Sequence, residues 1–351
     1  MPNEMNRGAA GPADKAVAMW LFACCFLVFA MISIGGITRL THSGLSIVEW
    51  QPLVGALPPL SDAQWEETFA KYRQTPEYKQ VNQGMSLDSF KGIFWWEYLH
   101  RLLGRLIGAA FLLPLLWFVW RGAIRRRLLP RLSGIFVLGG LQGALGWYMV
   151  ASGLVDDPRV SQYRLTAHLL MAFLIYAAML WLAMDLYGTR VRHQGQAQPM
   201  VVLRRHAWAI LCLVFLMVIT GGFVAGIRAG FAYNTFPLMN GNLFPPEMFL
   251  LEPWYLNFFS NMATVQFDHR LFAWILAIVV PWFWIRTRAK DVPPRVRIGA
   301  TWLLLLLALQ ITLGIATLLL VVPVPLAAAH QACAVLVFSA ALYVIHSIDK
   351  R

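Results

Sequence analysis

Four histidines near the starts of strongly apolar segments are the residues of this chain best suited to chemistry. They are His100 and His168 in the first half, and His269 and His330 in the second. An ionisable side chain inside a hydrocarbon layer is costly and therefore marks a functional site by default. Four of them at matching positions in two halves indicate ligation of a metal or a haem rather than packing.

Within each half, a histidine on the second apolar segment can face one on the fourth. Two imidazoles across a bundle interior are how a four-helix bundle holds a planar metal cofactor. Copper is disfavoured because no thiolate or thioether cluster accompanies the histidines. Small residues follow each second-segment histidine at four-residue spacing and leave room for a macrocycle: Gly104 and Gly108, then Ala273 and Ala277. We therefore expect a haem held by two histidines in each half. The alternative is that the glycines and alanines only allow close packing of neighbouring helices.

Arginines accompany the histidines. Arg101 and Arg270 each directly follow a candidate ligand, and Arg105 lies one turn beyond Arg101. A guanidinium near the membrane surface suits a haem propionate, which it can bind through two parallel hydrogen bonds. The alternative is that these side chains extend to lipid headgroups.

The two halves differ in one position beside the first histidine. Glu97 stands three residues before His100 and shares its helical face, whereas Gln266 occupies the matching position in the second half. A carboxylate can accept or relay protons during an oxidation, and an amide cannot. The first half therefore resembles a reacting site. A salt bridge between Glu97 and Arg101 is the alternative, and Asp268, on a different face, weakens the contrast.

The segments that position these residues are long enough to cross a membrane. The chain has 351 residues, of which 59% are hydrophobic and only 13% charged. Spanning a bilayer core takes about 20 apolar residues. The sequence predicts an all-α integral membrane protein without a soluble catalytic domain. We expect eight spans, at about residues 17–38, 93–120, 132–152, 163–187, 206–226, 262–286, 297–320 and 325–347.

The distribution of charge sets the expected orientation. The net charge of +12 does not indicate a nucleic-acid partner, because the basic residues gather in alternate loops, within 121–131, 190–205 and 286–297. The positive-inside rule then places both termini in the cytoplasm. All four histidines consequently lie in the first turns of spans that start at the extracytoplasmic side. Contact of the basic loops with anionic membrane lipid is a secondary reading.

An internal repeat relates the two halves. Gly35-Gly36, Arg39, Gly44 and Pro58-Pro59 recur as Gly221-Gly222, Arg228, Gly230 and Pro245-Pro246, and Gln142-x-x-x-Gly146 recurs as Gln310-x-x-x-Gly314. Four spans separate the copies, so the repeats are parallel. This predicts two pseudo-symmetric four-helix bundles. The expected parts are a tail 1–16, a first bundle 17–187 with an outward loop 39–92, a linker 188–205, a second bundle 206–347 and a tail 348–351.

Outward loops complete the predicted architecture. Loop 39–92 has mixed charge and aromatic content and can fold as a partly helical cover, and loop 227–261 is rich in Phe, Pro and Asn. Both can lid the histidine sites and exclude water. The four cysteines fall within predicted spans, so no disulfide is expected in these loops.

The sequence resembles the haem A synthase family, in its proteobacterial and mitochondrial branch, over about residues 17–347. The resemblance rests on GGITRLTHSGLSIVEWQP at 35–52, on the Glu97-x-x-His100-Arg101 box with Gly104, and on the second-half histidines. It implies an oxidoreductase of the bacterial inner membrane that converts haem O to haem A. The C8 methyl is hydroxylated twice, through haem I, to a formyl group. Other branches carry a cysteine pair in the outward loops, which this chain lacks.

The resemblance also implies roles for the histidines. His269 and His330 hold a resident haem b, His100 and His168 bracket the substrate haem, and Glu97 takes part in catalysis. Family-level expectations include an electron donor of unspecified identity, contact with haem O synthase and a homo-oligomer. Two alternatives stay open. One is a dihaem b electron-transfer protein, disfavoured because all ligands lie near one membrane face. The other is a haem transporter or chaperone for oxidase assembly.

Overall fold

The computed structural model describes residues 11–49, 54–155, 158–188 and 198–349 and contains eight long helices over these ranges. Each has an apolar stretch long enough to cross a membrane, which confirms the predicted all-α multi-pass class. Shorter helices lie between them. The long helices are α1 (Pro12–Leu40), α4 (Leu87–Trp120), α5 (Leu129–Ala151), α6 (Gln162–Tyr187), α7 (Gln198–Gly226), α9 (Met262–Arg286), α10 (Pro294–Leu319) and α11 (Val324–Asp349).

Several helices begin earlier than the hydropathy pattern indicates. Helix α1 starts at Pro12, α4 at Leu87 and α7 at Gln198, so helix covers parts of the predicted tail, outward loop and linker. Local capping explains the start of α4, because the Ser86 side chain accepts a hydrogen bond from the backbone N–H of Ser89. His100 therefore lies well inside a helix rather than in its first turn. Residues 1–10, 189–197 and 350–351, which belong to the predicted tails and linker, lie outside the described residues.

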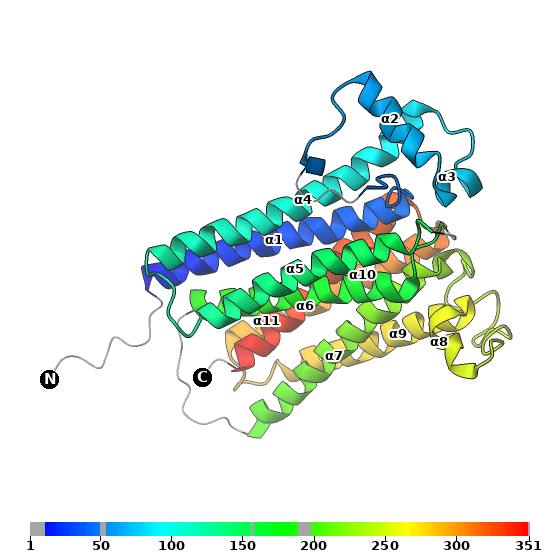
Figure 1. Ribbon diagram of the computed structural model, residues 1–351. Helices are drawn as coiled ribbons and strands as arrows, with labels where there is room; N and C mark the ends of the chain where they lie inside the picture. Colours follow the sequence, from blue (N-terminus) through cyan, green and yellow to red (C-terminus); the bar gives the residue numbers. More distant parts are fainter. Residues whose placement is uncertain (1–10, 50–53, 156–157, 189–197, 350–351) are drawn as a thin grey trace.

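The long helices pack in two groups with the same pattern of neighbours (Figure 1). In the first group α4 and α6 each contact α1 and α5. In the second group α9 and α11 each contact α7 and α10. The groups meet where α6 and α11 contact each other, α1 contacts α11, and α6 contacts α7. These contacts are consistent with the predicted pair of pseudo-symmetric bundles.

Polar contacts bind the two groups together along α6 and α11. Gln331 on α11 donates to the carbonyl of Ile32 on α1 at 2.6 Å, against Gly36, where no side chain fits. Tyr176 and Ser339 share a hydrogen bond of 2.8 Å. Each polar group is thereby satisfied within the apolar interior, where an unpaired one is costly.

A second junction lies beyond the ends of α1 and α7. His42 and Arg228 each follow the first glycine of a Gly-Gly pair by the same number of residues, and both have left-handed backbone, with φ of 54° and 59°. Arg228 donates through Nη2 to His42 Nδ1 at 3.0 Å. By position and conformation the repeat partner of Arg228 is thus His42, and not Arg39 as the residue types suggest.

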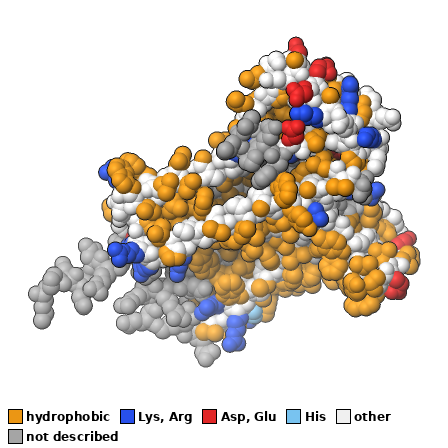
Figure 2. All heavy atoms as spheres, in the orientation of Figure 1, with side chains coloured by type: hydrophobic (Ala, Val, Ile, Leu, Met, Phe, Trp, Pro, Cys, Tyr) orange, Lys and Arg blue, Asp and Glu red, His pale blue; other side chains and the backbone are white. Residues whose placement is uncertain are grey.

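The apolar surface and the charges divide the molecule into two ends. Hydrophobic side chains cover the sides of the long helices, and many Lys and Arg side chains lie toward one end (Figure 2). We call this the arginine end; it includes Arg125, which pairs with Asp14, and Arg288, which follows α9. We call the opposite end, where the four histidines lie, the histidine end.

Short helices form a projecting lobe over the first group (Figure 1). Helix α2 (Asp62–Tyr72) packs on the extended start of α4. The two helices share a buried apolar cluster, against which Tyr78 of α3 (Pro76–Gln80) packs; its members are Trp65, Phe69, Tyr72, Phe90, Phe94 and Tyr98. The corresponding segment of the second group has η3 (Ala229–Phe231), η4 (Trp254–Leu256) and α8 (Asn257–Ser260). The helical content predicted for loop 39–92 is confirmed, and its role as a cover of the histidine site stays a prediction.

Candidate functional site

Each of the four histidines lies directly against a glycine of a neighbouring helix. A Cβ placed on Gly35 of α1 lies 2.9 Å from Cε1 of His100. On Gly146 of α5 it lies 2.9 Å from Cε1 of His168. These distances are too short for any side chain, so only glycine allows the imidazoles to occupy these positions.

The second half repeats the arrangement. A Cβ on Gly221 of α7 lies 3.3 Å from Cε1 of His269, and one on Gly314 of α10 lies 2.8 Å from Cε1 of His330. The glycines of the two repeated motifs therefore have a specific purpose. They place one imidazole from each of four helices, α4, α6, α9 and α11, at equivalent points of the two groups.

The second pair of histidines has the spacing of two ligands on one metal. The ring centroids of His269 and His330 lie 6.4 Å apart, with an angle of 78° between the planes. Metal–nitrogen bonds of about 2 Å place the ring centroids of two imidazoles on opposite faces of one ion about 6 Å apart.

A glutamine accompanies the second histidine of each pair. Gln142 donates through Nε2 to the carbonyl of His168 at 3.0 Å, and Gln310 Nε2 lies 3.5 Å from His330 Nε2. The Oε1 atoms of both glutamines are buried without a hydrogen-bond partner. Because buried polar groups are nearly always paired, the same exception in both halves indicates that each site is completed by something beyond the polypeptide.

Fewer side chains of the outer helices are buried at the histidine end of each group than at the arginine end. In α5 only Leu132 and Ile135 are buried, and in α10 no residue beyond Leu307 is buried. All four histidines stay partly exposed. The side chains around them therefore do not close off the imidazoles.

A bare metal ion fits these residues less well. Among the described residues no three His, Cys, Asp or Glu side chains come together in a way that could hold an ion. Structural and catalytic ion sites usually offer three or four protein ligands. Two opposed imidazoles instead match a haem, whose porphyrin supplies the remaining ligands.

Glu97 is held in a network at the histidine end of the first group. It is 2% exposed and accepts through Oε2 from Ser46 Oγ at 2.7 Å and from the Ile47 N–H at 2.8 Å. Its Oε1 accepts from Arg101 Nη2 at 2.7 Å, and Arg101 also donates to the carbonyls of Ile47 and Glu49. The salt bridge considered as the alternative role for Glu97 is therefore present.

The second group builds the same network without a carboxylate. Gln266 accepts from Arg270 Nη2 at 2.7 Å and donates to the Ala229 carbonyl at 2.6 Å. Arg270 also donates to the carbonyls of Tyr233 and Thr235. In both halves an arginine thus ties an outward loop to the helix that carries a histidine, which restricts the access of water to the site.

Two of the arginines predicted to bind propionates make hydrogen bonds within the polypeptide. Arg101 and Arg270 donate to the outward loops and to the residue one turn earlier. Arg105, one turn along α4, is partly exposed. A propionate role for the three arginines therefore stays a prediction.

Comparison with known proteins gives one consistent result. Residues 18–342 match the family described as cytochrome oxidase assembly protein. A haem A synthase of Nitrosospira multiformis is 62% identical over 96% of this chain and 95% of its own length. One from Nitrosomonas eutropha is 57% identical over 99% of both chains, and one from Parvibaculum lavamentivorans is 50% identical over 95% of both. The chain belongs to the haem A synthase family.

Sequence reasoning missed one polar group at the haem A synthase site. Thr220, directly before Gly221, lies with its hydroxyl 2.9 Å from Nδ1 of His269. The position of Thr220 beside the repeated glycine could have indicated this role. A single threonine in an apolar helix, however, usually bonds only to the backbone of its own helix.

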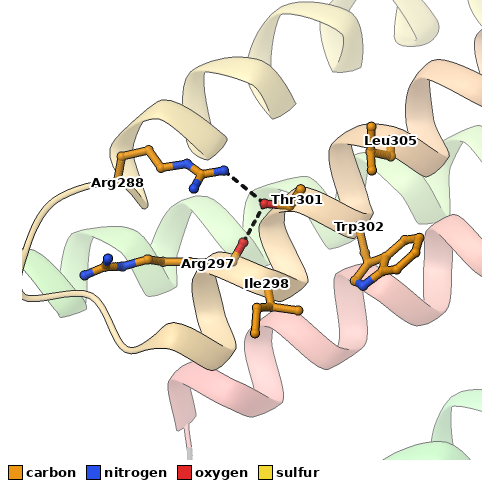
Figure 3. Close-up of a pocket in the computed structure, with 6 residues that line it drawn as sticks. All are labelled: Arg288, Arg297, Ile298, Thr301, Trp302 and Leu305. Atoms are coloured by element: carbon orange, nitrogen blue, oxygen red, sulfur yellow. Dashed lines mark hydrogen bonds between the residues drawn. The ribbon is translucent and has the colours of Figure 1, made fainter.

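A pocket at the arginine end lies away from the histidine sites (Figure 3). It encloses about 300 Å³ at the arginine end, between Arg288, Arg297, Thr301 and apolar residues of α10. Arg288 donates to the Thr301 hydroxyl at 3.1 Å. Because the pocket lies at the far end of α9 from His269, it takes no part in the histidine sites.

Proposed function

We propose that this protein converts haem O to haem A by oxidising the C8 methyl group to a formyl group in two successive hydroxylations. The first produces an alcohol, haem I, and the second a diol that loses water to give the aldehyde. Each hydroxylation removes two electrons from the carbon and adds one oxygen atom, either from water with an external two-electron acceptor or from dioxygen with two electrons and two protons from a donor, the second oxygen atom leaving as water. One observation carries the proposal. Two histidine pairs of the same construction stand in a chain related to haem A synthases, and only the first has a carboxylate one turn away.

The two pairs have different roles in this proposal. His269 and His330 would hold a resident haem b, which would supply one-electron transfer chemistry. His100 and His168 bind the substrate haem and orient it toward Glu97. The outward loops, tied down by Arg101 and Arg270, keep water from both sites.

Glu97 is the proposed proton acceptor of the first site. It follows the same helical face as His100, and its carboxylate is aligned by Arg101 and by Ser46. A side chain positioned in this way can take a proton released as the methyl group is oxidised. Gln266, which makes the matching contact to Arg270, has no such capacity.

The proposed setting is the inner membrane of a bacterium, with both termini in the cytoplasm and the histidine end outward. The basic loops at the arginine end support this orientation through the positive-inside rule. Haem O synthase, an electron donor and a second copy of the chain are the partners that the proposal includes.

The direct test is expression in cells that make haem O but no haem A, followed by extraction and chromatography of the haems. We expect haem A, or its alcohol intermediate, with the wild-type chain and neither with the His100→Ala variant. Protein that binds haem normally but produces neither compound contradicts the proposal.

Absorption spectra of the purified protein separate the remaining functions. A dihaem electron carrier holds two equivalent b haems permanently, and a transporter releases haem unchanged. A synthase holds one tight b haem and a second, variable pool that contains O-type or A-type haem.

A further inference from the structure

The imidazoles of His269 and His100 occupy equivalent places, but their Nδ1 atoms meet different groups. The Thr220 hydroxyl lies 2.9 Å from Nδ1 of His269 and 3.2 Å from the carbonyl of Met217. A carbonyl can only accept, so the hydroxyl donates to Met217 and accepts the Nδ1–H of His269. The lone pair on Nε2 of His269 is then free for a metal.

The first half has no such partner. Ile34 precedes Gly35 as Thr220 precedes Gly221, so a hydrocarbon stands where the second half has a hydroxyl. Nδ1 of His100 is buried without a hydrogen-bond partner. Among the described residues of the first half, no hydrogen bond to Nδ1 therefore fixes the tautomer of His100.

The opposite histidines differ in the same direction. His168 and His330 both lie against a glutamine of the preceding helix, whose side-chain amide reaches Nε2 at 3.4 Å and 3.5 Å. Nδ1 of His330 lies 3.1 Å from the backbone carbonyl of Gln310, whereas Nδ1 of His168 is buried without a hydrogen-bond partner. Because the partner of His330 is a backbone group, the contrast that depends on side chains lies at Thr220 and Ile34.

We infer that Thr220 is the positioning residue that makes the second site a permanent haem site. A hydrogen bond from the far nitrogen of a ligating imidazole fixes the ring and makes it a stronger donor, and its loss typically weakens metal binding 10- to 100-fold. A stronger donor also favours the ferric state and lowers the reduction potential. Ile34 leaves His100 a weaker, more readily exchanged ligand, as a site that must take up substrate and release product requires. This inference rests on the proposed function.

Two variants of Thr220 test the hydrogen bond separately from packing. Thr220→Val keeps the shape and removes the hydroxyl, whereas Thr220→Ser keeps the hydroxyl. The measurements are the midpoint potential of the b haem and the rate at which purified protein transfers haem to apomyoglobin. For Thr220→Val we expect haem to be lost about 10- to 100-fold faster. The midpoint potential should rise by about 59 mV for each tenfold change in the relative affinity for ferric and ferrous haem. Thr220→Ser should keep both the release rate and the potential of the wild type.

The reciprocal variant, Ile34→Thr, should act on the other site. Transfer to apomyoglobin is expected in two phases, a fast one from the first half and a slow one from the second. Ile34→Thr should slow the fast phase and Thr220→Val should speed the slow one. The inference is wrong if Thr220→Val matches wild type in potential and release, or if Thr220→Ser behaves like Thr220→Val.

His269→Ala separates failure of the inference from failure of the proposed function. If His269→Ala keeps the tightly bound b haem, the assignment of the second site itself is wrong. If it loses this haem while Thr220→Val remains like wild type, only the role of Thr220 is refuted.

Discussion

The two halves of this molecule share one framework and differ in a few side chains around it. Each half places two imidazoles against two glycines and ties an outward loop to the ligand helix through an arginine. The first half then has Glu97 and Ile34 where the second has Gln266 and Thr220. The repeated residues thus place the imidazoles, and we propose that the difference in reactivity between the halves depends on the unrepeated ones.

The outward segments differ as well. The first half builds a lobe from α2, α3 and the extended start of α4 around an apolar cluster. The second covers its site with a shorter segment that contains only single turns of helix. The half proposed to admit a substrate therefore has the larger cover, which packs on the extended start of a helix that carries a histidine.

The strongest test of the comparison is to remove one ligand from each half. His100→Ala should abolish haem A formation and leave the tight b haem in place, because the second site does not use His100. His269→Ala should lose that haem. Haem content by pyridine haemochrome spectra and product by chromatography check both. The opposite pattern reverses the assignment of the halves.

Exchange of the carboxylate and the amide is the next test. Glu97→Gln should lower haem A production by about 100-fold or more if Glu97 acts as a proton acceptor. The variant should still fold, because Gln266 shows that a glutamine at this position can bond to the following arginine. Gln266→Glu is the matched control and should leave production near wild type. Full activity of Glu97→Gln, with normal haem binding, refutes the catalytic role and leaves the salt bridge to Arg101 as its function.

Substitution of the two arginines should destabilise the charged network around Glu97 more than the neutral network around Gln266. Arg101→Ala leaves a buried carboxylate unpaired and should lower the free energy of unfolding by about 3 to 5 kcal/mol. Arg270→Ala leaves an amide and two carbonyls unpaired, at about 1 to 3 kcal/mol. Thermal unfolding in detergent, followed by tryptophan fluorescence, measures both. Equal losses indicate that the charge of Glu97 contributes little to stability.

The smallest effect concerns the pH dependence of the projecting lobe. Burial raises the pKa of Glu77 from 4.5 to about 7, and the negative charge of Glu97 adds to this. Because the raised pKa favours the neutral form in the folded lobe, stability is greatest below pH 4.5, falls as the pH rises toward 7, and then levels off. Hydrogen exchange of residues 62–80 should increase over that range, and exchange of 229–260 serves as the internal control. Glu77→Gln should remove the dependence.

Much of the site could be predicted because its signals are periodic and chemically rare. Apolar runs of membrane length located all eight helices, and the four cysteines lie in α1, α7 and α11, as expected. Histidines in such segments identified the ligand candidates. The glycines were visible as a repeat, but which histidine each one touches could not be inferred, because the contact joins different helices.

Other features depended on side-chain partners that no spacing reveals. Arg101 and Arg270 bond to loop carbonyls, and their expected binding of propionates stays a prediction. The start of α4 at Leu87 depends on a serine cap outside the apolar run. The pairing of His42 with Arg228 became apparent only from their shared backbone conformation.

The sequence by itself determined the class of the protein, its eight spans, its repeat and its four candidate ligands, because hydrophobicity and rare polar residues act locally along the chain. Only the tertiary structure decided which groups surround each imidazole. The hydroxyl of Thr220, the carbonyls around the arginines and the close glycine contacts come from other helices and loops. Hydrogen bonds are directional and short-ranged, so their partners are fixed only when the helices have packed.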